Sequence, residues 1–300
     1  MIVITRNRAS VLRDCLDHLL GQVEPPGQIV VVDSSDRFEP LEMPGVDHVA
    51  FPAGKAQMPK ARNEGARLST RPLVAYVDDD CLVDPDWLQQ IAQTYRNHPQ
   101  FVGVGGRISD ARWQYRPDLP IGKVFSDGSV VSNFFGDPGG VQEVDILPGG
   151  NMSFRRDWIL RVGGFDPRYV ATNHREDPDF CLRIRAAGGR IGYQPKAHAL
   201  HLNARTSLGE LKPWHEFYLR YSFARNEAFF LSRHFPREVL RRWWEDGLAQ
   251  ARRAFQARSL VGLLCVPVQF VSFGLGVGAY WFTGRRVPGE QCPSAPSTKV

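Results

Sequence analysis

The 300-residue sequence predicts an α/β fold with a mainly parallel sheet flanked by helices. The first observation is a set of short, continuous apolar runs, which are typical of strands buried on both faces. The second is that helix-like segments separate these runs, since parallel strands need a crossover connection between them. The third is that two of the runs stop at an aspartate. The predicted strands are Ile2-Val3-Ile4, Ile29-Val30-Val31-Val32 and Leu73-Val74-Ala75-Tyr76-Val77.

The predicted helix after the first strand has Ser10 as its candidate N-cap and ends before Pro25-Pro26-Gly27. A second helix is expected from about Pro59 to Leu68. Asp33 and Asp78 stop the second and third strands, and ligands of parallel sheets bind beyond the carboxyl ends of strands. The expected apolar face of the first helix, at spacings of three to four residues, is Leu12, Cys15, Leu16, Leu19, Leu20 and Val23.

The middle of the chain, from about 106 to 204, is less regular and richer in glycine, proline and aromatic residues. It contains one clear predicted helix, Asp179 to Ala187, which Gly188-Gly189 should stop. These patterns divide the main body of the chain into halves at 1–105 and 106–235.

The C-terminal part predicts membrane association. Residues 236–258 form a basic amphipathic helix candidate, followed by 24 residues, 259–282, without a charged side chain. That stretch is long enough to cross a bilayer, although Pro267 and four glycines also allow a re-entrant or surface-lying segment. The tail, 283–300, is expected to be disordered. The predicted apolar stripe is Leu240, Trp243, Trp244, Leu248, Ala251 and Phe255.

Charge and cysteine content exclude several classes of protein. The net charge of +5 resides between Arg205 and Arg258, where 11 basic residues stand against 6 acidic ones. A basic segment beside an apolar one suits an anionic membrane surface, and no nucleic-acid recognition motif is present. The five cysteines are widely spaced, which argues against a disulfide framework or a zinc ribbon and favours a reducing compartment. The N-terminus shows no secretory signal.

Asp78-Asp79-Asp80 is the strongest chemical signal in the sequence. On an extended strand, residues i and i+2 point the same way, so Asp78 and Asp80 are expected to share a ligand. Oxygen ligands suit Mg²⁺ or Mn²⁺, with substrate phosphates completing the shell. The alternative is a solvated turn whose aspartates cap the helix near Pro85-Asp86-Trp87.

The segment AYVDDDCLVDPDWL resembles the D-x-D strand end of family 2 glycosyltransferases, which have the GT-A fold. Four further segments resemble that family in the same order. The likeness extends from residue 1 to about 226, and five ordered motifs are far more specific than one. The other four are IVITRNR through IVVVDSSD, KARNEG, GGNMSFRRDWILRVGGFD and HREDPDFCLRIRAAGGRIGYQPKAHALH.

The resemblance implies a nucleotide-diphospho-sugar donor, a divalent metal (Mn²⁺ or Mg²⁺) and a glycan or lipid-linked acceptor. It assigns the nucleotide-sugar to the half 1–105 and the acceptor to the half 106–235. It implies that Asp78, Asp80 and His201 bind the metal. His198 is the nearby competitor of His201 for this role. Gly149 beside Gly150 would let the backbone approach a phosphate or sugar closely, or simply form a tight turn. The implied donor contacts are Thr5, Arg6, Asp33, Arg62, Asp78, Asp79, Gly150 and Asn151.

The resemblance also places the catalytic base in the pair Glu176-Asp177, with Asp177 as the base. Asp177 precedes Pro178, so it is also expected to serve as a helix N-cap. A helix N-terminus favours the carboxylate anion, which a general base requires. Asp179 is expected to support the site or to cap the helix.

The sequence departs from the family pattern at three places. Thr5-Arg6-Asn7 replaces the usual Pro-x-Tyr/Phe-Asn, and Asp33-Ser34-Ser35-Asp36 replaces Asp-Asp-Gly-Ser. The Gln-x-x-Arg-Trp motif of processive synthases is missing, because Val239 precedes Arg242-Trp243 where glutamine should stand. Its absence favours transfer of one sugar per encounter. The expected reaction is a single inverting displacement, with the enzyme at the cytoplasmic face of the membrane.

Two alternatives remain open on sequence grounds. A sugar-phosphate nucleotidyltransferase would also use acidic metal ligands, but its usual glycine-rich phosphate loop is missing at Thr5-Arg6-Asn7-Arg8. A catalytically silent sugar-nucleotide-binding or membrane-scaffold protein is disfavoured by the intact Asp78, Asp80 and Asp177. The donor sugar, its base and the acceptor are not indicated by any residue pattern.

Overall fold

The structure is a computed structural model that describes residues 1–52, 58–203, 214–258 and 260–284. Its strands are β1 (Ile2–Thr5), β2 (Ile29–Asp33), β3 (Val46–Ala50), β4 (Leu73–Asp78), β5 (Cys81–Val83), β6 (Phe101–Asp110), β7 (Lys123–Val124), β8 (Val130–Val131), β9 (Gln142–Val144), β10 (Asn151–Arg155) and β11 (Arg190–His201). Its helices are α1 (Ala9–Leu20), α2 (Met58–Leu68), α3 (Trp87–Asn97), α4 (Arg156–Arg161), α5 (Glu176–Ala186), α6 (Trp214–His234), a 3₁₀ turn (Pro236–Glu238), α7 (Val239–Gln256) and α8 (Leu260–Thr283).

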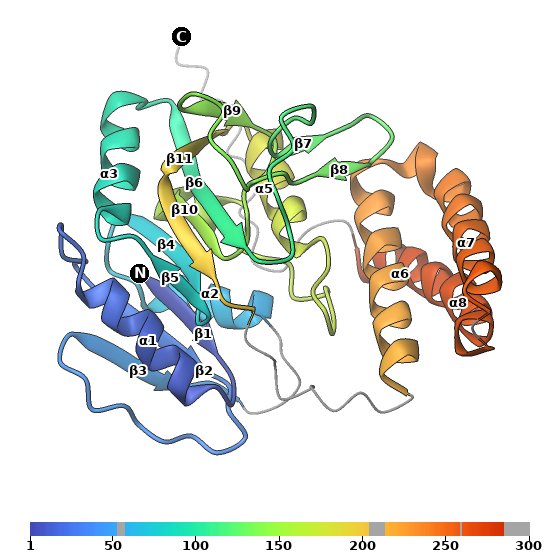
Figure 1. Ribbon diagram of the computed structural model, residues 1–300, viewed down its shortest axis with the longest axis horizontal. Helices are drawn as coiled ribbons and strands as arrows, with labels where there is room; N and C mark the ends of the chain where they lie inside the picture. Colours follow the sequence, from blue (N-terminus) through green and yellow to red (C-terminus); the bar gives the residue numbers. More distant parts are fainter. Residues whose placement is uncertain (53–57, 204–213, 259, 285–300) are drawn as a thin grey trace, which may run out of the picture.

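A nine-stranded mixed sheet forms the centre of the molecule, in the order β3-β2-β1-β4-β10-β6-β11-β5 with β9 beside β11 (Figure 1). Strands β3, β2, β1 and β4 are parallel, and β10 is antiparallel to both of its neighbours. The predicted α/β class is confirmed. The three predicted strands are present, each one residue longer at its carboxyl end.

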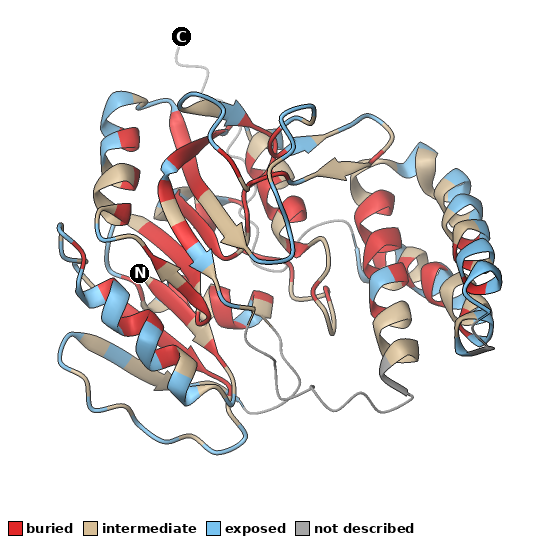
Figure 2. Ribbon diagram, viewed as in Figure 1, coloured by how far each residue is buried: buried red, intermediate tan, exposed pale blue. Residues whose placement is uncertain are grey.

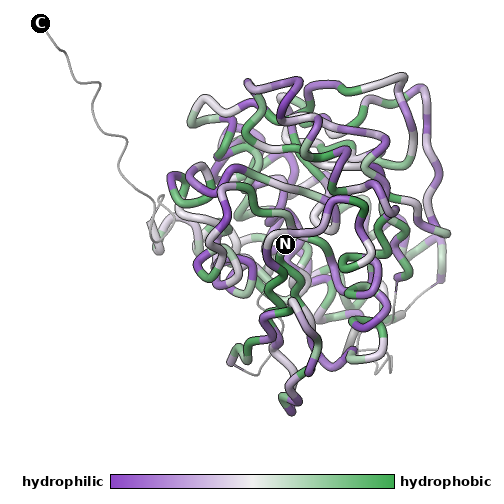
Figure 3. Tube along the Cα trace, turned by 90° about the vertical axis from the view of Figure 1, so that its left-hand side faces the viewer, coloured by the Kyte–Doolittle hydropathy of each residue, from purple (hydrophilic) through white to green (hydrophobic). Residues whose placement is uncertain are grey.

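Helices cover both faces of the sheet, as predicted for this class. One apolar core joins α1 and α3 to the sheet, and the other joins α4 and α5 to the opposite face. Figure 2 shows these buried segments lining the sheet, and Figure 3 shows hydrophobic and hydrophilic stretches alternating along the chain. The two cores hold the strands rigidly, so the residues at the strand ends have fixed positions.

Three details of the predicted helices are wrong. The N-cap of α1 is Arg8, with Ser10 inside the helix, and α1 ends at Leu20 with Gly21 as its C-cap. Val23 lies outside the helix and is 63% exposed, so it belongs to no apolar face. Helix α5 begins at Glu176, three residues earlier than predicted, because Pro178 fits within its first turn.

Helices α6, α7 and α8 pack together beside the sheet (Figure 1). Helix α8 continues through Pro267 without a break, and Val261–Thr283 is long and apolar enough to cross a membrane. However, α8 lies along α6, and the two helices approach closely at Gly276. A Cβ added to Gly276 would lie 2.1 Å from the carbonyl oxygen of Arg225 on α6. Its C-terminal end is held by Arg168, which donates to the carbonyl oxygens of Thr283 and Gly284.

This packing buries one side of α8 against the protein. Helix α6, its neighbour, carries charged residues that pair within the protein: Glu227 pairs with Arg175, and Arg233 pairs with Asp166 and Asp179. Cys265, Phe273 and Tyr280 of α8 are buried inside the protein. The expected tail lies outside the described residues from position 285, whereas Thr283 ends α8 and Gly284 follows it.

Candidate active site

The acidic turn follows β4 at the carboxyl edge of the sheet. Asp79 is fully buried, accepts a hydrogen bond from Thr5 Oγ1 at 2.7 Å and pairs with Arg8. Burial raises the pKa of Asp79 to about 7, against the opposing effects of Arg8 and Thr5. Asp79 and Thr5 therefore tie the acidic turn to the end of β1. Direct donor contact by either side chain is not supported, because Thr5 is only 3% exposed.

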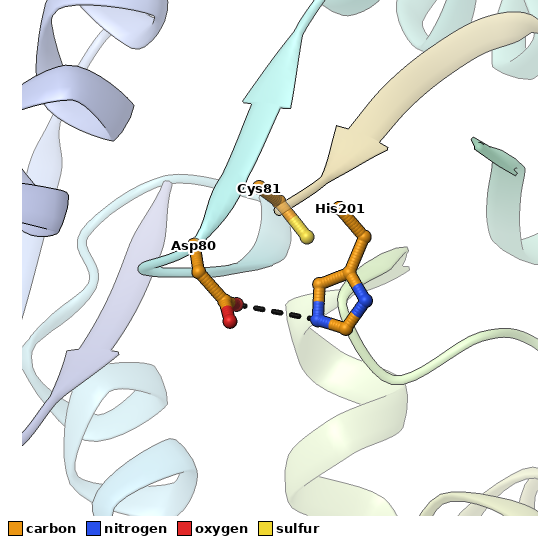
Figure 4. Close-up of side chains that lie close together, drawn as sticks. All are labelled: Asp80, Cys81 and His201. Carbon is orange, nitrogen blue, oxygen red and sulfur yellow. Dashed lines mark ion pairs between the residues drawn. The ribbon is translucent and has the colours of Figure 1, made fainter. Parts of the chain in front are cut away.

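Asp80, Cys81 and His201 bring their ligand atoms within 4.8 Å of one another (Figure 4). Asp80 Oδ1 lies 3.3 Å from His201 Nε2, and His201 Nδ1 lies 3.3 Å from Asp110 Oδ2. The hydrogen bond that His201 donates to Asp80 raises the pKa of His201 to about 9, so an imidazolium and a carboxylate pair here when no metal is bound. A divalent cation would replace that proton.

The donor set fits a divalent cation through its oxygen and nitrogen atoms. Burial raises the pKa of the Cys81 thiol well above its usual value, so Cys81 stays protonated and is a poor ligand. Asp78 is not in this group. The strand ends at Asp78 and the chain turns through Asp79 and Asp80, so the alternation expected for an extended strand does not apply. His198, the competitor, pairs instead with Asp84 and Ser109.

Arg62 on α2 joins the end of β4 to the start of α5. Its guanidinium pairs with Glu176, lies 3.4 Å from Asp78 Oδ1 and donates to the Gly149 carbonyl oxygen at 3.1 Å. It is 1% exposed, and it packs over the Phe165 ring. The expected diphosphate contact is therefore not supported, because protein carboxylates already surround this cation. Arg62 positions the acidic groups on either side of it.

The start of α5 carries Glu176 and Asp177. Arg175 is the N-cap residue, with φ of 72°, and Asp177 is the second helical residue, so its expected role as N-cap is wrong. Burial raises the pKa of Asp177, with Arg62 opposing the rise, and burial raises the pKa of Glu176 to about 8. A raised pKa makes Asp177 a stronger base than an ordinary aspartate.

A pocket of about 300 Å³ joins the two functional groups. His201 lines one part of it and Asp177 another, while Trp113, Phe134 and Phe135 supply apolar walls. Asp177 is half-buried, so its carboxylate is reachable from the pocket. A proton acceptor and a candidate metal ligand thus face the same space.

Gly149, Gly150 and Asn151 lie between these groups. A Cβ at Gly150 would be 2.8 Å from Asp78 Oδ2, so a larger residue here would displace the Asp78 carboxylate. Asn151 is fully buried, donates to the carbonyl oxygens of Arg107 and Ala197, and accepts from Trp87 Nε1. Its amide is saturated inside the protein, so its expected donor contact is not supported.

Asp33 and Arg6 lie at the carboxyl ends of β2 and β1. Asp33 accepts a hydrogen bond from the Ser35 backbone N–H at 2.8 Å and lies 3.2 Å from His48 Nε2. Arg6 pairs with Asp36 at 2.9 Å. Both positions remain compatible with nucleoside binding at this edge of the sheet, and their roles stay predictions.

Four contributors to the site were not predicted from the sequence. Arg8 holds Asp79 and Asp80, and its signal was a second basic residue just beyond the first strand. Asp110 orients His201 from the end of β6, which lay in the irregular region. His174 and Arg175 line the pocket from the turn before α5, where no pattern distinguishes them.

Residues 1–163 match glycosyl transferase family 2, and the chain belongs to that family. It is 28% identical over 199 residues to a glucosyl-dolichyl phosphate glucuronosyltransferase of Haloferax volcanii, covering 63% of each chain. It is 29% identical over 226 residues to a pre-mycofactocin glycosyltransferase of Mycobacterium tuberculosis, covering 69% of this chain and 43% of that protein. The matches therefore span about half to two thirds of these relatives' lengths.

Solved structures share the fold. TarS 1-349 of S. aureus, solved with UDP-GlcNAc, superposes with a TM-score of 0.57 at 15% identity, covering 93% of this chain and 80% of that one. GalNAc-T7, solved with UDP, GalNAc and Mn²⁺, gives a TM-score of 0.56 at 14% identity, covering 76% of this chain and 50% of that one. The GT-A fold expected from the sequence is confirmed.

Proposed function

We propose that the protein transfers a sugar from a nucleotide-diphosphate donor to an acceptor hydroxyl by a metal-assisted inverting displacement. The observation that carries this proposal is the pocket shared by Asp177 and His201, with Asp80 paired to His201. The family membership supports the reaction class. A succinoglycan biosynthesis protein of Rhizobium meliloti, 28% identical over 209 residues, covering 69% of this chain and 62% of that protein, supports a role in cell-surface or exopolysaccharide assembly.

The proposed mechanism assigns one task to each group. Asp80 and His201 would hold a divalent cation, which neutralises the leaving diphosphate when bound. Asp33 binds the nucleoside at the edge of the sheet. Asp177 accepts the proton of the acceptor hydroxyl as the hydroxyl oxygen bonds to the anomeric carbon and the diphosphate departs from the opposite face. Arg62 keeps Asp177 and Glu176 in place without contacting substrate.

Metal removal tests the site. Donor turnover is expected to vanish in EDTA and to return with Mn²⁺ or Mg²⁺, whereas Asp80→Ala should stay inactive at any metal concentration. Asp84→Ala is the matched control, because Asp84 also pairs with a histidine of β11 but lies outside the metal group. The readouts are donor turnover and the thermal shift given by UDP-, GDP- and dTDP-sugars with Mn²⁺. Full activity in chelator would remove Asp80 and His201 as ligands.

The same assays separate the two alternatives. Release of pyrophosphate from a nucleoside triphosphate would favour a sugar-phosphate nucleotidyltransferase. A thermal shift with a donor but no transfer or hydrolysis would favour the silent binding protein.

We also propose that α7 and α8 hold the enzyme peripherally on the membrane. Each helix exposes an apolar stripe at spacings of four and seven residues. Nucleotide sugars are cytoplasmic, so we expect the cytoplasmic face. The stripe on α7 is Leu240, Trp244, Leu248 and Phe255, and the stripe on α8 is Leu264, Val271, Leu275 and Phe282.

Substitution of the α7 stripe tests the membrane proposal. Leu240 and Phe255 are 70% and 76% exposed, so Leu240→Glu/Phe255→Glu should fold normally. Vesicle binding should fall roughly tenfold or more per residue, since each buried side chain contributes about 1.5–3 kcal/mol. Val23→Glu/Leu160→Glu, at exposed apolar positions elsewhere, is the control. Point substitutions are preferable to truncating the chain near Gln256. That truncation would delete α8 and expose the apolar face of α6 that α8 covers. The proposal would be contradicted if wild-type protein did not sediment together with anionic vesicles.

A further inference from the structure

A second pocket, of about 380 Å³, lies between the turn before α5 and the helices α6, α7 and α8. Four arginines line it: Arg175, Arg220, Arg242 and Arg253. We propose that this arginine pocket binds the phosphate group of a lipid-linked acceptor, an inference that rests on the proposed glycosyl transfer. The acceptor's sugar or hydroxyl end would then reach Asp177.

The charge of the arginine pocket favours an anion. Its two acidic lining residues, Glu227 and Asp246, leave a formal excess of two positive charges. Glu227 is fully committed, because His174, Arg175 and Arg242 all pair with it. Burial raises the pKa of Asp246, and the neighbouring Arg242 opposes that rise.

Donor groups remain available in the arginine pocket. Arg253 pairs with no carboxylate among the described residues, and its Nε donates to the Ala249 carbonyl oxygen of its own helix. Arg242 Nε makes no hydrogen bond in the described part of the chain, although it lies 4.0 Å from Asp246 Oδ2. Arg220 pairs with Glu216, but this surface pair is open to solvent and contributes little. Several guanidinium groups together can donate hydrogen bonds to the several oxygens of one phosphate group.

The position of the arginine pocket connects it with the reaction. His174 and Arg175 line both this pocket and the catalytic pocket, so the two spaces share a wall. Asp177 lies two residues beyond Arg175 at the start of α5. A phosphate held by Arg175 would therefore place the adjoining part of the acceptor beside the proposed base.

The other side of the arginine pocket meets the apolar helices. Gln250 and Arg253 of α7 and Gln269 of α8 line it, and both helices expose the apolar stripes described above. The apolar stripes, the arginine pocket and the catalytic pocket thus follow one another. An acceptor with an apolar chain, then an anionic group, then a reacting hydroxyl would match these three surfaces in turn. A free phosphate or a soluble sugar phosphate would leave the apolar stripes without a role.

The test uses full-length protein without donor and three probes: geranyl phosphate, geraniol and inorganic phosphate. Geranyl phosphate should bind in calorimetric titration, and Arg220→Gln/Arg253→Gln should weaken it by about tenfold or more, as expected for lost charge-assisted contacts. The matched control is Arg237→Gln/Arg252→Gln, which removes the same charge from exposed arginines outside the pocket lining. The control should bind within about twofold of the wild type, and both double variants should keep the wild-type Tm.

Three results would overturn the inference. Equal losses in the test and control variants would show only a general charge effect. If geraniol bound as tightly as geranyl phosphate, the phosphate group would not be what the pocket recognises. If inorganic phosphate bound as tightly as geranyl phosphate, the lipid chain would contribute nothing to binding. Donor turnover is assayed separately. If geranyl phosphate does not bind but the enzyme turns over its donor, only the inference about the arginine pocket is wrong. Phosphate binding without any donor turnover would instead sink the proposed transferase activity.

Discussion

Asp177→Asn is expected to lower the rate of sugar transfer by about 10²–10⁴ while leaving the fold and donor binding in place. Asparagine has nearly the same shape but cannot accept the acceptor proton. Asp177 is the second residue of α5 and not its N-cap, so the substitution should cost less than about 1 kcal/mol of stability. Asp33, Asp80 and His201 are unchanged, so donor affinity should stay within a few-fold of the wild type. Transfer kinetics and donor calorimetry on the same protein measure both effects.

The chain offers a matched control for this substitution. Asp157 is the second residue of α4, as Asp177 is of α5, but it is exposed and lies outside the pocket. Asp157→Asn should therefore change neither transfer nor donor affinity. Near-normal transfer by Asp177→Asn would move the base elsewhere. Loss of donor binding would instead make Asp177 part of the donor site.

The sequence predicted the elements whose pattern is local. β1, β2 and β4 are continuous apolar runs, and their boundaries were right to within one residue. The strand β3 was missed because its burial is only partial and its sequence, Val46–Ala50, alternates with exposed polar positions. β10 enters the sheet between β4 and β6 from the region beyond residue 106, and no local pattern shows such an insertion.

The acidic motif stands out in the sequence, but its geometry depends on distant residues. Asp79 is held by Thr5 and Arg8, which lie more than 70 positions away in the chain. Arg62 meets Glu176 across 114 positions and is sealed from solvent by that packing. A sequence shows which carboxylates are present. Which of them face solvent, and which are neutralised by a buried cation, depends on packing between separate elements.

The C-terminal helices show the same limit. Length and hydropathy of 259–282 favoured a membrane span, and both are properties of the segment alone. The surface-lying alternative depends on α6, whose buried Phe229 and Ala228 contact α8 in one apolar cluster. The contact between α6 and α8 cannot be read from the segment 259–282 alone.

Asp179→Ala is expected to destabilise the protein by about 3–5 kcal/mol, because it would leave the largely buried Arg183 without a carboxylate partner and Arg233 with Asp166 alone. Asp179 is fully buried and accepts from Arg183 Nε at 2.8 Å and Arg233 Nη1 at 2.7 Å, with His234 Nε2 at 2.9 Å. These contacts join α5 to the end of α6. The expected role as helix cap is therefore wrong, and the support role is structural. Thermal unfolding should show a fall in Tm on the order of 10 °C.

The pH dependence of stability distinguishes this explanation from a simple loss of packing. Arg183 and Arg233 lower the pKa of Asp179 despite its burial. A lowered pKa stabilises the folded state above the unfolded value of about 3.9, and that stabilisation is lost as the pH falls. The variant should therefore differ most from the wild type near neutral pH and least in strong acid. Asp118→Asn, which breaks the exposed pair with Arg116, should change stability by less than about 1 kcal/mol. A destabilisation of Asp179→Ala that is the same at every pH would mean that its ion pairs do not hold α5 against α6.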